Sequence, residues 1–281
     1  MQFRPFGPTG QRVSVIGLGT WHIDLGDRRQ AVAALRSGLD AGVNHIDTAE
    51  MYGDAELVIA EAIAGRRDEV FLVSKVLPSN ASRKGVRTAC ERSLKRLGAD
   101  RLDCYLLHWR GSYPLDETIA GFLDLAGEGK IRSWGVSNFD ADDMEEIHAP
   151  ALAVGESAAC NQVLYHLKER AIEHAVIPTC KRQGAAVVAY SPFGHDDFPA
   201  PSTPGGKALR EIADAHGATP YQVALAFLIR DPGVFAIPKA SSPKHAAENA
   251  AAGDLTLSPE DIARIDQAFP RGPKPRSLPM L

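Results

Sequence analysis

The chain has 281 residues, of which 44% are hydrophobic and 23% are charged, and its formal net charge is −4. This composition is that of an ordinary globular protein and excludes a disordered chain. The mildly acidic balance argues against a surface that binds nucleic acid or anionic lipid. No apolar run approaches the roughly 20 residues needed to cross a bilayer, and the first residues lack the apolar core of a signal peptide.

The cysteines form no C-x-x-C pair, so they indicate neither a zinc knuckle nor a disulfide framework. We expect buried free thiols and a cytoplasmic protein. The four cysteines are Cys90, Cys104, Cys160 and Cys180.

Short runs rich in Val, Ile and Leu alternate with amphipathic segments along the chain. After a predicted hairpin around 7–10, the predicted strands are 15–21, 43–48, 70–76, 102–108, 131–136, 158–165, 185–190 and 234–238. The predicted helices are 28–41, 55–64, 82–97, 115–128, 141–148, 172–183, 207–216, 220–229, 243–251 and 258–269. Glycines 42, 65 and 98 follow three of these helices, where a left-handed residue is often needed. Ser258 is suited to cap the last helix, with Pro259 at its first position.

Strands that alternate with helices imply parallel strands joined by right-handed crossovers. Length alone suggests two domains at about 150 residues each, but no linker divides the chain. Eight strand–helix units fit a closed (β/α)8 barrel of the TIM type better than an open sheet of fewer strands. We therefore expect an α/β protein in which residues 1–281 form one barrel domain. An N-terminal hairpin and a C-terminal helix with a short tail complete it.

Polar side chains stand where the predicted strands end, and in a barrel this edge carries the active site. Asp47, Lys75 and His108 terminate the apolar runs NHID, FLVSK and CYLLH on three successive strands. A charge that ends a buried strand needs a partner, so we expect these side chains to lie within reach of one another. Tyr52 follows Asp47 by five residues, and its hydroxyl is expected to return to the barrel mouth.

This set is suited to protonating a carbonyl oxygen. A tyrosine with a pKa of about 10 is a poor acid at neutral pH. The Lys75 ammonium is expected to lower that pKa, while Asp47 holds the ammonium in place. His108 can donate a hydrogen bond to a substrate oxygen. Because none of these groups carries a hydride, a reduction needs a cofactor.

Other polar features favour structural roles. His45 shares the strand face of Asp47 one layer deeper and fits a packed interior histidine. A metal site built from these residues is disfavoured, because Lys75 would repel the cation. Trp134 is expected in the core. The basic face of helix 82–97 is interpreted as solvated surface rather than a nucleic-acid site; its residues are Arg83, Lys84, Arg87, Arg92, Lys95 and Arg96.

Seven motifs resemble those of the aldo-keto reductase family, in the family's order and over nearly the whole chain. They are GVNHIDTAEMYG at 42–53, LVSK at 72–75, DCYLLHW at 103–109, GKIRSWGVSNF at 129–139, NQVLY at 161–165, AYSP at 189–192 and IPK at 237–239. The resemblance implies a (β/α)8 barrel that binds NADPH without a Rossmann domain. Three motifs, ACERSLKRL, YLLHW and NQVLYHL, look closest to bacterial reductases of small aldehydes, including the methylglyoxal reductase type.

Carried over residue by residue, the resemblance implies a catalytic tetrad in which Tyr52 is the general acid, Lys75 and Asp47 tune it, and His108 orients the carbonyl. Ser137, Asn138 and Gln162 would bind the nicotinamide carboxamide, and Tyr190 would stack on the ring. The remaining expected cofactor residues are Thr20, Trp21, Ser191, Phe193, Lys239, Ser241, Ser242, His245, Glu248 and Asn249.

Two departures from the family pattern concern the cofactor. His245 stands where members that strongly prefer NADPH usually carry Arg, and Ala240 replaces a frequent Ser. Histidine is largely neutral at pH 7 and lacks the planar charged fork of arginine. Lys239 and Lys244 remain as cations, so we expect NADPH to be preferred less strictly, with NADH tolerated.

The expected substrate is a small carbonyl compound, an aldehyde or a methylglyoxal-like dicarbonyl, taken by a monomer without nucleic-acid or membrane partners. An aromatic and apolar wall is expected from Trp21, Met51, Tyr52, Trp109, Phe139 and Phe193. The short tail after Phe269 suggests an open site. The alternative is a cofactor-sensing, weakly catalytic regulatory subunit of a larger assembly. The complete tetrad favours the enzyme.

Overall fold

The computed structural model describes residues 1–281. The strands are β1 (Phe3–Pro5), β2 (Arg12–Ser14), β3 (Leu18–Gly19), β4 (His45–Asp47), β5 (Phe71–Val76), β6 (Cys104–Leu107), β7 (Trp134–Ser137), β8 (Cys160–Leu164), β9 (Ala186–Tyr190) and β10 (Val234–Ala236). The α-helices are α1 (Arg28–Asp40), α2 (Ala55–Ala62), α3 (Arg83–Leu97), α4 (Leu115–Gly127), α5 (Ala141–Ala153), α6 (Val176–Gln183), α7 (Pro204–His216), α8 (Pro220–Leu228), α9 (Pro243–Ala251) and α10 (Pro259–Ala268).

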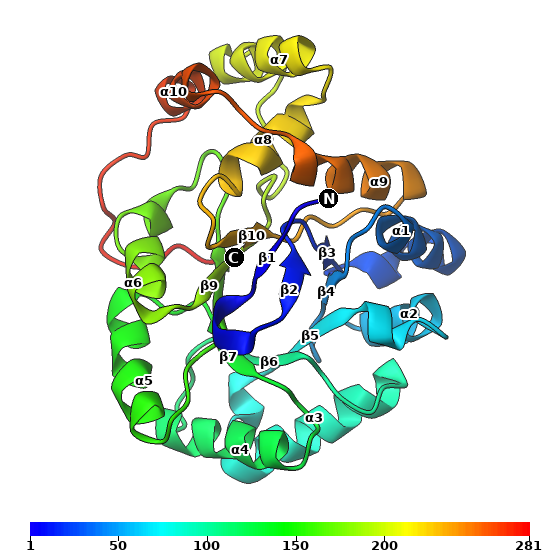
Figure 1. The fold of residues 1–281 in the computed structure, drawn as a ribbon, viewed down its shortest axis with the longest axis vertical. Helices are drawn as coiled ribbons and strands as arrows, with labels where there is room; N and C mark the ends of the chain where they lie inside the picture. Colours follow the sequence, from blue (N-terminus) through cyan, green and yellow to red (C-terminus); the bar gives the residue numbers. More distant parts are fainter.

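Strands β3 to β10 form one parallel sheet in sequential order. Hydrogen bonds between β10 and residues 15–17, which lead into β3, close this sheet. Gly17 N–H donates to Ala236 O over 2.8 Å, and Ala236 N–H donates to Val15 O over 3.0 Å. The predicted (β/α)8 barrel is therefore confirmed, with the helices arranged as a ring outside the strands (Figure 1). The first predicted strand, 15–21, is shorter in the structure, because only Leu18–Gly19 forms a strand, Ile16 adds an isolated bridge to Ala236, and Trp21 lies in a turn.

The antiparallel β1–β2 hairpin, predicted around 7–10, lies across one end of the barrel (Figure 1). Phe6 is fully buried there, and its ring packs against Phe71 and Phe235 with centroid distances of 4.8 and 5.1 Å. Gly7 follows with φ +53°, and a Cβ at this position would lie 2.1 Å from the carbonyl oxygen of Ala159. The hairpin thus plugs the amino-terminal end of the strands, which leaves the opposite end for a site.

The ends of several helices follow the predicted signals. Gly98 closes α3 with φ +60°. Ser258 and Asp261 form a capping box at the start of α10, with hydrogen bonds of 3.1 and 3.0 Å. Two helices are longer than predicted: α7 begins at Pro204 because Thr203 caps it, and α5 continues to Ala153 through Pro150. The predicted helix 172–183 is divided into a 3₁₀ turn and α6.

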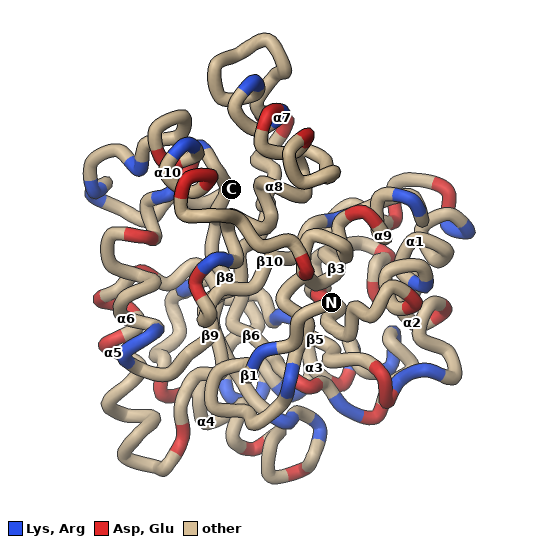
Figure 2. Tube along the Cα trace, turned by 45° about the horizontal axis from the view of Figure 1, so that its top comes forward, with Lys and Arg blue, Asp and Glu red and all other residues tan.

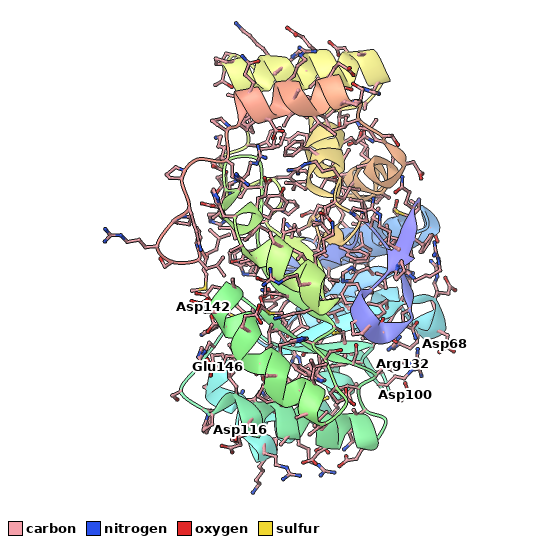
Figure 3. The ribbon with its side chains drawn as sticks, turned by 60° about the vertical axis from the view of Figure 1, so that its left-hand side comes forward. Asp68, Asp100, Asp116, Arg132, Asp142 and Glu146 are labelled. Atoms are coloured by element: carbon pink, nitrogen blue, oxygen red, sulfur yellow. The ribbon has the colours of Figure 1, made fainter.

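The helices present apolar faces to the barrel and polar faces outward. Figure 2 shows acidic and basic residues interspersed around the outer helices, and Figure 3 shows the labelled Asp116, Asp142 and Glu146 at the exterior of α4 and α5. Helices α7 and α10 lie side by side (Figure 3). All four cysteines are buried free thiols, as predicted, and Trp134 is in the core. No helix has the length and apolar character required to cross a membrane.

Candidate active site

Alternation along the strands brings the polar residues into the barrel mouth. On β5, Phe71 and Val73 belong to the apolar cluster inside the barrel, so Lys75, two residues further, points the same way. Leu106 on β6 places His108 in the same manner just after that strand, and Val188 places Tyr190 at the end of β9. The barrel interior is therefore apolar along most of the strands and polar at their carboxyl ends, where the active sites of barrel enzymes lie.

Lys75 lies at the centre of this polar layer. Its Nζ atom donates hydrogen bonds to Oδ1 of Asp47 over 2.6 Å and to the Thr48 carbonyl over 2.8 Å. The Tyr52 hydroxyl oxygen lies 3.5 Å from the same Nζ atom. Lys75 and Asp47 have exposed side-chain fractions of 0% and 2%. The three side chains thus form a continuous chain from a buried charge to a hydroxyl, as the strand-end pattern predicts.

His108 lies beside Tyr52, with ring centroids 5.7 Å apart in an edge-to-face arrangement. Its Nδ1 atom is buried without a hydrogen-bond partner. Its backbone carbonyl accepts a 3.1 Å hydrogen bond from Nδ2 of Asn138, which links the fourth strand unit to the fifth. The structure therefore brings together all four residues of the predicted tetrad.

The protonation states follow from burial and from the Lys75 charge. Lys75 lowers the pKa of Tyr52, as expected, but burial raises it by more, so the net shift of the Tyr52 pKa is upward. Burial would lower the pKa of Lys75, but Asp47 and Tyr52 raise it above its ordinary value. Burial and the Lys75 charge lower the pKa of His108 to about 2. At neutral pH the site therefore holds a phenol, an ammonium and a neutral imidazole.

A cavity of about 170 Å³ opens onto this group. It is lined by Trp21, Met51, Tyr52, His108, Trp109, Ser137, Asn138, Gln162, Tyr190 and Leu281. Of the predicted wall, Trp21, Met51, Tyr52 and Trp109 line this cavity, with Met51 46% exposed at its rim, whereas Phe193 lines a neighbouring cleft. The prediction that Phe139 lies on this wall is wrong. Phe139 is fully buried in the main core, because its side chain points away from the side on which Asn138 lines the cavity.

The C-terminal tail also corrects an expectation. Leu281 lines the cavity, and its backbone N–H lies 3.4 Å from the Tyr190 hydroxyl oxygen. The tail therefore narrows the site that a short tail was expected to leave open. Tail length alone does not indicate this position, because the segment has no periodic pattern and its path depends on the surface under it.

A second cleft, of about 350 Å³, continues from the cavity and shares Trp21, Tyr52, Gln162 and Tyr190 with it. Its other lining residues include the predicted Thr20, Ser191, Phe193 and Lys239. Lys239 is exposed and forms no ion pair with a carboxylate. An elongated space with a free cation at its edge matches an extended phosphorylated cofactor.

The polar groups between the two spaces are held by one another. The Tyr190 hydroxyl donates a 2.9 Å hydrogen bond to Oδ1 of Asn138, and the Ser137 hydroxyl donates to the Gln162 carbonyl over 2.8 Å. Asn138 is one of four non-glycine residues with positive φ, at +61°. Such a conformation costs about 1 kcal/mol or more and is typical of functional sites.

The remaining predicted cofactor residues lie in α9 or just before it, and none of them lines the cavity or the cleft. Ser242 caps this helix by accepting a 3.3 Å hydrogen bond from His245 N–H. Lys244 pairs with Glu248 over 3.7 Å, while Ser241 and His245 are exposed and Asn249 is buried. A helix N-terminus with exposed cations nearby is suited to a phosphate group.

Two contacts in the site were not predicted from the sequence. Nε2 of Gln162 donates a 2.7 Å hydrogen bond to Oδ2 of Asp47, so this amide supports the buried ion pair. His195 lines the cleft, and its ring stacks on Trp21 at 5.7 Å. The first contact joins residues 115 positions apart, and the second joins two loops. No periodicity in the sequence reports either contact.

The barrel and its buried Asp–Lys–Tyr–His group define a carbonyl-directed oxidoreductase. Residues 15–269 match the model of the Aldo/keto reductase family, and the chain belongs to this family, whose cofactor is NADP(H). It is 46% identical over 259 residues to methylglyoxal reductase YeaE of Escherichia coli (strain K12), which covers 91% of this chain and 90% of that protein.

Solved structures of aldo-keto reductases are also similar to this chain. An aldo-keto reductase from Klebsiella pneumoniae in complex with NADPH matches with a TM-score of 0.90 and 44% identity, covering 100% of this chain and 99% of that one. The thermostable aldo-keto reductase Tm1743, in complex with the inhibitor epalrestat, matches with a TM-score of 0.88 and 37% identity, covering 95% and 100%.

Proposed function

We propose that this protein reduces aldehydes and reactive dicarbonyls, methylglyoxal among them, to alcohols with NADPH, and that it does so in the cytoplasm as a single barrel domain. The observation that carries the proposal is the position of Lys75 Nζ between Asp47 Oδ1 and the Tyr52 hydroxyl. The likeness to a named methylglyoxal reductase supports the substrate class.

In the proposed mechanism the carbonyl oxygen of the substrate lies between Tyr52 and His108 in the small cavity. When bound, NADPH supplies the hydride that the carbonyl carbon receives. Tyr52 gives its hydroxyl proton to the oxygen as negative charge develops there. Lys75 stabilises the resulting phenolate, and Asp47 keeps Lys75 charged and fixed. His108, neutral in this environment, donates a hydrogen bond to the same oxygen.

The residues present fit the cofactor. The Asn138–Tyr190 hydrogen bond fixes an amide and an aromatic ring at the junction of the cavity and the cleft, where a nicotinamide would be held together with Ser137 and Gln162. Lys239 and the start of α9, with Ser241, Ser242 and His245, would hold the phosphate groups. The free Lys239 ammonium supports this assignment, because a cation without a carboxylate partner is available to an anion.

The experiment that tests this function follows NADPH oxidation by absorbance with a panel of methylglyoxal, glyoxal, aromatic aldehydes and keto sugars. Turnover with small aldehydes is expected. The variant Tyr52→Phe should lose about a hundredfold or more of this turnover, while NADPH binding, measured by quenching of protein fluorescence, should be unchanged. Activity of this variant within about tenfold of the unmodified protein would refute the general-acid role.

A regulatory, cofactor-sensing role predicts a different result from the same panel. The protein would then bind NADPH, turn over none of the carbonyl compounds, and co-purify with a partner in fixed ratio. The intact arrangement of Tyr52, Lys75, Asp47 and His108 favours the enzyme, since a subunit that only senses the cofactor has no need of a proton donor in the cavity.

A further inference from the structure

Helix α3 carries two arginines that reach the loop holding Tyr52. Arg92 and Arg96 lie four residues apart and therefore share one helix face. The side chain of Arg96 is 30% exposed, and its guanidinium is directed to the segment between β4 and α2. Arg92 is 53% exposed, in line with the interpretation of this face as solvated surface, whereas that interpretation does not describe the partly buried Arg96.

Arg96 contacts the chain immediately after Tyr52. Its Nη2 atom donates to the Gly53 carbonyl over 2.6 Å and to Oδ1 of Asp54 over 3.0 Å. Its Nε atom donates to Oε2 of Glu56 over 3.0 Å. One planar guanidinium therefore binds three acceptors, two in the turn after Tyr52 and one in the first turn of α2, a geometry that an ammonium does not reproduce.

Arg92 contacts the chain just before Tyr52. It donates to Oε2 of Glu50, whose side chain is only 3% exposed. The other oxygen of this carboxylate accepts hydrogen bonds from Leu77 N–H over 2.6 Å and from Nδ2 of Asn80 over 3.0 Å. Glu50 thus joins the Tyr52 loop to the segment that follows β5, so the loop is held on both sides of the tyrosine.

The same network reaches the strand of Lys75. Glu56 is 2% exposed, and its Oε1 atom accepts a 3.4 Å hydrogen bond from Ser74, the residue before Lys75. Glu50 N–H donates to the Lys75 carbonyl over 3.2 Å. Arg96 is therefore linked, through Glu56 and Ser74, to the backbone that carries Lys75, and directly to the backbone that carries Tyr52.

We infer that Arg96, assisted by Arg92, is a positioning residue that sets the distance between Tyr52 and Lys75. The inference rests on the proposed function, because it assumes that Tyr52 gives a proton. The Tyr52 hydroxyl is at the outer limit of a hydrogen bond from Lys75, at 3.5 Å, so a small displacement of the loop separates the pair. A misplacement of about 1 Å can cost about a hundredfold in rate.

The test compares Arg96→Gln with Arg87→Gln, a matched change on the same helix. Arg87 is also ion-paired, to Glu91 and Glu128, but it contacts nothing in the Tyr52 loop. We expect Arg96→Gln to lower kcat about tenfold or more, with the dissociation constant of NADPH unchanged within about twofold. Arg87→Gln should leave both values unchanged, and Arg96→Lys should restore part of kcat.

The pH profile provides a readout that a purely structural role would not move. Lys75 lowers the pKa of Tyr52 against the larger effect of burial, so a loosened contact lets that pKa rise. The basic limb of kcat should then move to higher pH in Arg96→Gln. If this variant melts too early to assay, Asp54→Ala removes one exposed acceptor of Arg96 and should show a smaller loss in the same direction.

A double-mutant cycle tests the positioning role of Arg96 separately from the general-acid role of Tyr52. If Arg96 acts through Tyr52, then Arg96→Gln costs nothing further in a Tyr52→Phe background. Equal losses from Arg96→Gln with and without Tyr52 would overturn the positioning role alone, as would equal behaviour of the Arg96 and Arg87 variants. Full activity of Tyr52→Phe would overturn the proposed function, and the inference with it.

Discussion

The ammonium of Lys75 and the carboxylate of Asp47 form a 2.6 Å ion pair that is almost completely excluded from solvent. Neither charge would be stable alone at this depth, because an unpaired buried charge is far more costly than a pair. Gln162 donates to the second Asp47 oxygen, so the carboxylate is held on both sides. The pair keeps a cation under Tyr52, and the pH and mutational behaviour of the site follow from it.

Replacing Asp47 with Asn should affect both stability and rate. The variant leaves Lys75 buried without a counter-charge, which is expected to destabilise the fold by about 3 kcal/mol and to lower the Lys75 pKa. A neutral Lys75 stabilises the phenolate poorly, so kcat should fall about tenfold or more. Thermal denaturation and steady-state kinetics measure the two effects.

Asp103→Asn is the matched control. Asp103 is equally buried, at 3% exposure, and pairs with Arg67 over 2.8 Å, but it precedes β6 at the opposite end of the barrel from His108. Its loss should lower the melting temperature and leave kcat unchanged. Similar kcat losses in both variants would show that the Asp47 effect is one of stability only.

The rate of carbonyl reduction should be independent of pH over a wide range. His108, with a pKa lowered to about 2, stays neutral across the working range, and the raised pKa of Tyr52 keeps the phenol protonated. A general acid must be protonated, so kcat is expected to be flat from about pH 5 to about pH 9 and to fall above that. A fall of kcat between pH 6 and pH 8 would contradict these protonation states.

His45 should make the fold sensitive to acid. It is fully buried with no hydrogen-bond partner on either ring nitrogen, between Phe6 and Phe71, and burial lowers its pKa to about 4. The unfolded chain takes up this proton near pH 6.5 and the folded chain does not. Stability is therefore lost as pH falls from about 6.5 to about 4, by about 3 kcal/mol.

The variant His45→Leu should remove that part of the acid sensitivity, measured by urea unfolding at pH 7 and pH 4. His108 titrates in the same direction and remains, so the dependence on pH is reduced and not abolished. The control His148→Gln, on the outside of α5, should retain the full dependence. An unchanged pH dependence in His45→Leu would indicate that His45 takes up a proton in the folded state.

His245 should set the preference between the two nicotinamide cofactors. Its side chain is exposed at the first turn of α9, and the exposed Lys239 lies in the segment that leads to this helix. His245→Arg supplies a permanent charge and a planar fork, so the preference for NADPH over NADH should rise about tenfold. Michaelis constants for both cofactors provide the measurement, with His245→Gln as the uncharged control. A preference above about a thousandfold in the unmodified protein would contradict the role given to His245.

The barrel and the four central residues were accessible from the sequence because both depend on local order. Alternation of side chains along a strand, helix caps such as Ser258, and polar residues at strand ends are short-range patterns. Parallel strands bring their carboxyl ends to one edge, so Asp47, Lys75 and His108 meet wherever such strands form a barrel. His45 is an interior residue for the same reason.

Contacts between elements far apart in sequence required the folded chain. Phe139 is in the core, Gln162 supports Asp47, Leu281 reaches Tyr190, and Arg96 binds the Tyr52 loop from a different helix. Each depends on how a helix, loop or tail docks on the barrel, which is decided by side-chain packing over many residues and leaves no periodic signal. The pKa of Tyr52 belongs to this group, since burial outweighs its charged neighbour. Local sequence patterns thus specify which residues meet at the barrel mouth, whereas long-range packing sets how these residues are held and in which protonation state.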